Sequence, residues 1–145
     1  MKRISITFLA LLLSLTCIAQ TIHYSSTNGT AIKGYDPVAY FLQNKAIEGS
    51  DEFTLNWSDS KWNFSTKANL DSFKIAPEKY APQYGGYCAY GCSENHKSPT
   101  DPNAWTILNN KLYLNYNLKV KDYWTKEKEK RIATADANWA TLNKE

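Results

Sequence analysis

The sequence has few of the cysteine, histidine and methionine side chains that hold soft metal ions. Its 145 residues include three cysteines, two histidines and one methionine. It contains no phosphate-binding loop, no serine nucleophile motif and no glycine-rich dinucleotide fingerprint. Internal repeats and low-complexity tracts are also missing. These absences exclude the common nucleotide-binding motifs. They also leave few cysteine and histidine side chains for a thiol nucleophile or a metal centre.

The chain also lacks a strong charge of either sign. It carries 17 Lys and Arg against 14 Asp and Glu, and two of the basic residues, Lys2 and Arg3, lie in a segment that we expect to be removed. A nearly neutral chain has no general electrostatic attraction to nucleic acid, so we expect no nucleic-acid partner. Near the C-terminus, basic side chains alternate with acidic ones, which is typical of a solvated helix face.

Only one long apolar run is present, at residues 4–15, directly after Lys2 and Arg3. The run is too short and wrongly flanked to span a membrane, and it is typical of a secretory signal. Small residues at positions 17 and 19 predict cleavage after Ala19. A lipid anchor on Cys17 is the alternative, but the residues before this cysteine match the lipidation motif poorly.

We therefore predict a signal peptide at residues 1–19 and a secreted or periplasmic domain at residues 20–145, without a transmembrane segment. A mature chain of about 126 residues fits one domain with one substantial core. Five Trp and ten Tyr are spread along the chain, and we expect their main role to be packing.

Local patterns predict mixed secondary structure in the first half of the domain. Residues 53–57 and 62–64 alternate apolar and polar side chains, and the polar residues between them suit a turn, so they predict a hairpin. Ser65 or Thr66 then begins a helix, which Pro77 ends or follows with another turn.

A second hairpin is predicted from residues 104–108 and 111–116, because Asn109 and Asn110 tolerate the positive φ angles of a two-residue turn. Apolar residues then recur at helical spacing through residue 139, predicting one long or two shorter amphipathic helices that close over a sheet face. The predicted fold class is α+β: a small antiparallel sheet of two hairpins packed with several helices, including the C-terminal amphipathic helices.

One set of motifs resembles a known family. It comprises Asp36-Pro37-Val38-Ala39-Tyr40, Trp62-Asn63-Phe64-Ser65-Thr66, Phe73 and Pro77-Glu78-Lys79-Tyr80. This pattern resembles a YHS domain from which the metal-binding cysteines have been lost, because Ala39, Ser65 and Asn69 stand where metal-binding members carry cysteine. Alanine has no donor atom, and serine and asparagine offer hard oxygens instead of soft thiolates. We expect no zinc or copper at these positions and a space filled by apolar packing and neutral hydrogen bonds.

The resemblance extends over nearly the whole mature chain. Further motifs are similar to those of small secreted bacterial YHS-domain proteins: Lys33-Gly34-Tyr35, Tyr80-Ala81-Pro82-Gln83-Tyr84-Gly85-Gly86-Tyr87-Cys88-Ala89-Tyr90, Asp101-Pro102 and Lys111-Leu112-Tyr113-Leu114-Asn115-Tyr116. The resemblance implies a single YHS-like domain and an exported protein. It implies no particular reaction.

Cys88, Cys92 and His96 form the constellation best able to carry chemistry, since they follow one another at intervals of four residues. On one helix they would share a stripe, and two thiolates one turn apart can hold a soft metal such as copper or zinc. Eight residues of helix span about 12 Å, so one ion reaches both Cys88 and His96 only if the helix ends between them.

Other interpretations of these residues stay open. Cys88 and Cys92 can form a disulfide, although helical geometry points their Cβ atoms poorly. Alternatively, Cys88 is a small buried residue beneath a cluster of tyrosines at positions 84, 87 and 90. A catalytic thiol would need His96 within hydrogen-bond reach and an orienting group, which no sequence feature shows.

We therefore predict a binding module that holds a small ligand or a soft metal ion, and we assign no catalytic residue. The expected ligand-binding residues are Tyr84, Tyr87, Cys88 and Tyr90, and the expected metal ligands are Cys88, Cys92 and His96. The alternatives are a thiol- or metal-dependent enzyme that uses Cys88 or Cys92 with His96, and a non-catalytic module that docks onto another envelope protein.

Overall fold

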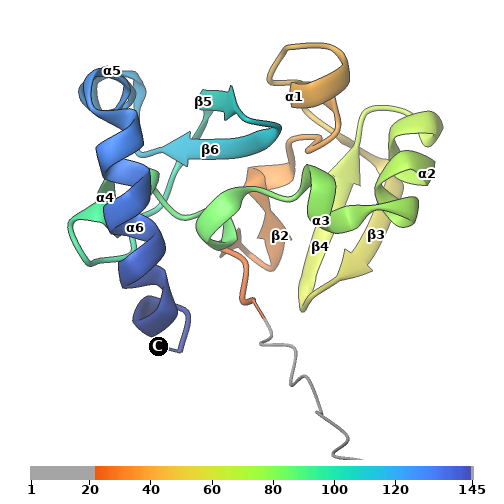
Figure 1. Ribbon diagram of the computed structural model, residues 1–145. Helices are drawn as coiled ribbons and strands as arrows, with labels where there is room; N and C mark the ends of the chain where they lie inside the picture. The colour runs from red at the N-terminus through yellow and green to blue at the C-terminus, as the bar shows by residue number, and fades with distance from the viewer. Residues whose placement is uncertain (1–21, 145) are drawn as a thin grey trace, which may run out of the picture.

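The computed structural model describes residues 22–144, so the predicted signal peptide at residues 1–19 lies outside the described residues. The described chain contains six α-helices, a mixed four-stranded sheet and a separate two-stranded hairpin, which confirms the predicted α+β class (Figure 1). The elements in chain order are β1 (Ser26–Thr27), β2 (Thr30–Ala31), η1 (Ile32–Gly34), α1 (Ala39–Leu42), β3 (Ser50–Trp57), β4 (Ser60–Phe64), α2 (Lys67–Ile75), α3 (Pro77–Tyr80), η2 (Gln83–Gly86), α4 (Ala89–Ser93), β5 (Asp101–Leu108), β6 (Lys111–Asn115), α5 (Leu118–Lys126) and α6 (Lys128–Leu142).

The four-stranded sheet has the order β1-β2-β4-β3. β3 and β4 form the predicted hairpin, and the turn residues Ser58 and Asp59 have φ of 49° and 59°, as a tight two-residue turn requires. β2 joins β4 in parallel through Thr30 and Lys61, so the sheet is mixed instead of purely antiparallel. Two residues of β2 are too few to show an alternating pattern in the sequence.

The second hairpin, β5 and β6, turns at Asn109 and Asn110 with φ of 51° and 58°, as predicted. It forms a separate sheet and does not extend the first one, and both of its faces are covered. Leu112 and Leu114 of β6 belong to one hydrophobic cluster, and Tyr113 between them belongs to another. Alternation along a single strand thus places this hairpin between two cores. Figure 1 shows it between the four-stranded sheet and the C-terminal helices.

The two cores differ in what surrounds them. The first lies under the four-stranded sheet and is dominated by the rings of Trp62, Phe64 and Phe73. The second lies among η2, α4, β6 and the C-terminal helices, with Trp124 fully buried at its centre.

The C-terminal segment forms two helices that meet at Glu127, where the backbone leaves the helical region with φ of −133°. Asn117 caps α5 by accepting a hydrogen bond from the Val120 amide at 2.9 Å. α5 packs on the β5–β6 hairpin, as expected, whereas α6 packs mainly on α4. Across residues 22–144 there is no helix with the length and apolar character needed to cross a bilayer.

A buried carboxylate joins the start of α1 to the start of α2. Asp36 is fully buried, and its Oδ1 accepts hydrogen bonds from the amides of Val38 (2.8 Å) and Ala39 (3.2 Å). Its Oδ2 accepts from the amide of Ser65 (2.8 Å), the Ser65 hydroxyl (2.7 Å) and Nδ2 of Asn69 (2.6 Å). A buried carboxylate is tolerated only when its oxygen atoms accept hydrogen bonds, and these donors supply them.

The three residues that the predicted YHS resemblance aligns with metal-binding cysteines lie around this one carboxylate. Ala39 contributes a backbone amide, Ser65 contributes an amide and a hydroxyl, and Asn69 contributes a side-chain amide. Hydrogen bonds do fill the space, as expected, but they are not all between neutral groups, because Asp36 supplies a carboxylate at their centre. The sequence motif did not indicate this role of Asp36.

Replacing Asp36 with Asn should destabilise the fold by about 3 kcal/mol or more, because an amide nitrogen would face donors that now meet a carboxylate oxygen. Chemical denaturation measures the effect. Asp71→Asn is the matched control, since Asp71 pairs with Lys67 at the surface and should cost less than about 1 kcal/mol. If Asp36→Asn does not fold, Ser65→Ala should still lose about 1 to 3 kcal/mol. Equal stability of Asp36→Asn and Asp71→Asn would contradict this role.

Candidate functional site

The segment from Tyr84 to His96 turns sharply and then forms a short helix. Cys88 is the N-cap of α4, and its Sγ accepts a hydrogen bond from the Gly91 amide at 3.4 Å. The helix ends at Ser93, and the amide of His96 bonds back to the Gly91 carbonyl at 3.0 Å. The helix thus stops before His96, which was the condition for a site shared by Cys88, Cys92 and His96.

The two thiols are free and buried, with exposed fractions of 2% for Cys88 and 0% for Cys92. The Sγ of Cys88 lies 3.7 Å from Oδ1 of Asn115. Burial, and then the nearby Cys88, raise the pKa of Cys92 to about 12. Because the thiolate is the nucleophile and the metal ligand, a raised pKa weakens Cys92 in both roles. The buried position matches the packing interpretation of these cysteines.

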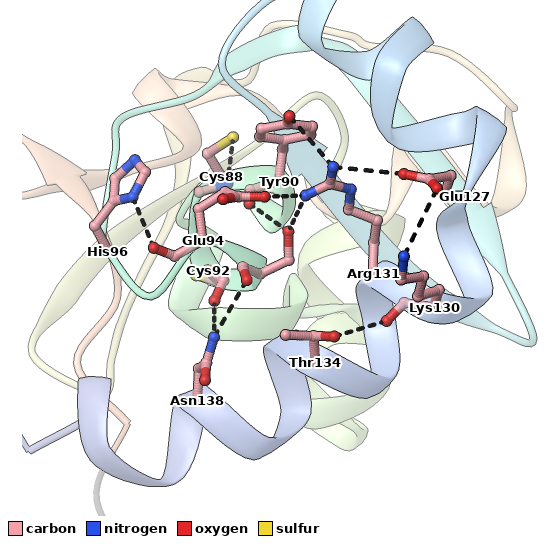
Figure 2. Close-up of polar contacts among 12 residues, drawn as sticks. Cys88, Tyr90, Cys92, Glu94, His96, Glu127, Lys130, Arg131, Thr134 and Asn138 are labelled. Atoms are coloured by element: carbon pink, nitrogen blue, oxygen red, sulfur yellow. Dashed lines mark hydrogen bonds and ion pairs between the residues drawn. The ribbon is translucent and has the colours of Figure 1, made fainter.

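His96 does not complete a metal site with the two sulfurs. Its side chain is exposed, and Nδ1 lies 3.4 Å from the Glu94 carbonyl oxygen, toward which Figure 2 shows the ring turned. Within residues 22–144 there is no group of three or more His, Cys, Asp and Glu side chains arranged to hold a metal ion. The predicted three-ligand centre is therefore not assembled in this structure, because the cysteines face the core and the histidine faces solvent.

Tyr90 belongs to a joint between α4 and α6 that is centred on Arg131 (Figure 2). The guanidinium lies 4.0 Å from the centroid of the Tyr90 ring and donates to the Tyr90 hydroxyl at 3.3 Å and to the Ser93 hydroxyl at 3.0 Å. It also pairs with the carboxylates of Glu94 and Glu127. The cavity of about 220 Å³ beside it is lined by groups already engaged in this network, so we assign the joint a structural role.

Tyr84 lies in a turn that ordinary side chains avoid. Tyr84, Gly85 and Gly86 all have positive φ, of 53°, 57° and 77°. A bulky residue in this region carries strain, and such strain is concentrated at functional sites. At Gly85 any side chain is excluded, because a Cβ would lie 2.5 Å from the His23 carbonyl oxygen. The turn holds the Tyr84 hydroxyl 2.8 Å from Oδ1 of Asp136, to which it donates.

A cavity of about 330 Å³ opens beside this turn, between the N-terminal segment, α3, η2 and α6. We call it the seam cavity, because it lies where the two hydrophobic cores meet. The residues of its lining that carry rings or polar groups are Tyr24, Glu78, Gln83, Tyr84, Asp136 and Trp139. Tyr24 packs against the first core, and Tyr84 and Trp139 pack in the second.

Burial and the two carboxylates of the seam cavity raise the pKa values of its tyrosines. Burial, followed by the charge of Glu78, raises the pKa of Tyr24 to about 12. Burial and the hydrogen bond to Asp136 raise the pKa of Tyr84 well above its ordinary value. Both phenols therefore stay protonated at neutral pH. The rings of Tyr84 and Trp139 meet nearly edge to face, with centroids 5.9 Å apart and planes at 63°.

The predicted ligand-binding residues do not converge on one site. Tyr84 lines the seam cavity, whereas Tyr90 faces Arg131 and Cys88 lies in the core. Tyr87 also contacts the Trp139 ring, with centroids 6.3 Å apart, and Lys97 lies over the Tyr87 ring. Sequence reasoning found Tyr84 because the tyrosines cluster in the chain.

Sequence reasoning missed the other residues of the seam cavity. Tyr24 and Asp136 lie in no motif, Glu78 belongs to a motif that indicated only a family resemblance, and the three come from different parts of the chain. Trp139 was predicted only to lie on the apolar face of a C-terminal helix. The paired glycines after Tyr84 were the one local signal of a turn with positive φ.

No known protein-family model, curated protein sequence or solved structure matches the chain. The resemblance to YHS-domain proteins therefore stays a prediction.

Cys92 should resist alkylation in the folded protein. A rise in pKa from 9.0 to about 12 leaves about 1000-fold less thiolate at pH 8 than in the unfolded chain. Peptide mapping after iodoacetamide treatment, with and without urea, measures the difference at Cys92. Because the pKa of Cys92 is raised in the folded protein, its protonated thiol supports the full stability of the fold below pH 9. That stability is lost as the pH rises from 9 toward 12, because the unfolded chain releases the proton first. Equal labelling with and without urea would show that Cys92 is accessible.

Replacing Arg131 with Ala should cost about 1 to 3 kcal/mol of stability, because the change removes a cation–π contact and several charge-assisted hydrogen bonds. Lys130→Ala is the matched control on the same helix, since Lys130 is exposed and its Nζ lies 3.9 Å from Glu127. This control should stay within about 0.5 kcal/mol of the unchanged protein in urea denaturation. The joint has no structural importance if the two variants unfold at the same urea concentration.

Proposed function

We propose that the chain is a secreted, YHS-like binding module, and that its ligand site is the seam cavity beside Tyr84. The observation that carries the proposal is the cavity itself: a concave site at the junction of two cores, lined by rings and by a small number of polar groups. Small-molecule sites in proteins commonly have this composition. The strained backbone at Tyr84 directs one of these polar groups, the hydroxyl, toward the wall formed by α6.

Two observations support the wider assignment. Ala39, Ser65 and Asn69, which the resemblance aligns with metal ligands, lie around the single carboxylate of Asp36, as one former metal site would require. The apolar run at residues 4–15 supports export.

A larger cavity, of about 460 Å³, is a weaker candidate. It lies at the β3–β4 turn, and its lining carries Asp59 and Lys61, whose opposite charges favour no class of ligand. Another cavity, of about 350 Å³, mixes acidic residues with Lys33 and Lys61 in the same way.

Docking onto an envelope protein is a second candidate function, and exposed side chains near the β6–α5 connection favour it. Tyr116, Leu118 and Tyr123 are each about half exposed. However, all five Trp are buried or half-buried, so the largest rings are unavailable for such a surface. The seam cavity is therefore the better-supported site.

A screen of small amines, carboxylates, alcohols and sugars tests the proposal, with the indole N–H signal of Trp139 as the reporter in two-dimensional NMR. At least one class should shift this signal saturably. Gln83→Trp should abolish the shift, because Gln83 is half-buried in the cavity lining and a larger side chain fills the space. Lys74→Trp is the control, since Lys74 is exposed on α2 outside the cavity, and binding should persist.

Two outcomes would overturn the proposal. In one, no compound class gives a saturable shift at Trp139. In the other, Gln83→Trp folds normally and binds as well as Lys74→Trp does.

A further inference from the structure

The charge of the seam cavity has one sign. Glu78 and Asp136 both line it, and neither forms an ion pair with any residue of the described chain. Among the described residues that line the cavity there is no lysine or arginine. Both carboxylates belong to exposed residues, while Tyr84 is only 6% exposed, so the negative charge lies toward solvent and the ring lies deeper. Such a cavity attracts cations and repels anions.

The walls of the cavity suit a cation that carries hydrocarbon. Tyr24, Tyr84 and Trp139 contribute aromatic surface, and the rings of Tyr84 and Trp139 meet at an angle, so they form a corner and not a flat stack. Aromatic faces attract cations through their quadrupole, and aromatic sites are used to bind quaternary ammonium groups. A bare metal ion is a poor fit, because aromatic carbon provides no ligand atom and the carboxylate of Asp136 already accepts the Tyr84 hydroxyl.

We infer that the ligand of the seam cavity is a small organic cation, an alkylated ammonium whose methyl or methylene groups contact the rings while its charge faces Glu78 and Asp136. This inference rests on the proposed function and names the ligand class for the same site. Ligands with a net negative charge, such as free phosphates and simple carboxylates, are repelled, because Glu78 and Asp136 form no ion pair within the described chain. Neutral polyols are disfavoured because they leave that charge without a partner.

Choline and 3,3-dimethylbutan-1-ol form a matched pair of probes, since they share one shape and differ in charge. Titration of the full mature protein, followed at the Trp139 indole signal, should show choline binding at least about tenfold more tightly than the alcohol. Choline affinity should also fall with added salt, because exposed carboxylates are screened. Glycine betaine should bind more weakly than choline, since its carboxylate adds a repulsive charge.

Variants of the carboxylates test the cause of this preference. Glu78→Gln and Asp136→Asn should each weaken choline binding about threefold to tenfold and leave the affinity for the alcohol nearly unchanged. Glu129→Gln is the control, because Glu129 is an exposed carboxylate on the same helix as Asp136 and lies outside the cavity lining. It should bind choline as the unchanged protein does.

An alkylated ammonium reaches the protein either free or as a lipid headgroup. Sedimentation with phosphatidylcholine vesicles, compared with phosphatidylglycerol vesicles, distinguishes the two sources, and either source supports the ammonium assignment. Equal affinity for choline and the alcohol would overturn the inference and leave the proposed site intact. Absence of choline binding would also overturn it. The proposed function fails as well if every compound class in the wider screen fails to bind, or if Gln83→Trp folds normally and binds as well as Lys74→Trp does.

Discussion

The turn at Tyr84, Gly85 and Gly86 is the constraint on which the arrangement of the two cores depends. Three successive positive φ angles reverse the chain as it leaves the first core and enters the second. Because Gly85 has no side chain, the N-terminal segment approaches closely, and the amide of Ser25 donates to the Gly85 carbonyl at 2.6 Å. The same turn directs Tyr84 to Asp136 on α6. The seam cavity is the space that these packed segments leave between them.

The charged groups at the Asp36 cluster, the Arg131 joint and the seam cavity fall into two kinds. Asp36 and Arg131 are surrounded by partners and hold elements together, so their charges are already satisfied. Glu78 and Asp136 line a cavity without a cationic partner in the described chain. The carboxylate group is the same in both roles. The surrounding donors determine whether it stabilises the fold or attracts a ligand. On this basis we assign the joint at Arg131 a structural role and propose the seam cavity as the ligand site.

Local signals in the sequence predicted the local structure well. The pair Asn109-Asn110 indicated its hairpin, and Thr66 caps α2 by accepting from the Asn69 amide, because both effects act within a few residues. The candidate site was predicted only at Tyr84. Glu78 and Asp136 are distant in sequence and no pattern connects them, so only the folded chain shows that they share a cavity. The spacing of Cys88 and Cys92 indicated a shared helical stripe, but spacing does not reveal that both thiols are buried in the core.

The most direct measurement of the central claim is X-ray diffraction from crystals of the protein grown with (2-bromoethyl)trimethylammonium, because bromine gives an anomalous signal that locates the ligand. The claim predicts an anomalous peak inside the seam cavity, with the ammonium group against the rings of Tyr84 and Trp139 and its charge toward Asp136. A ligand bound only elsewhere on the protein, or an empty cavity at a saturating concentration, would contradict it.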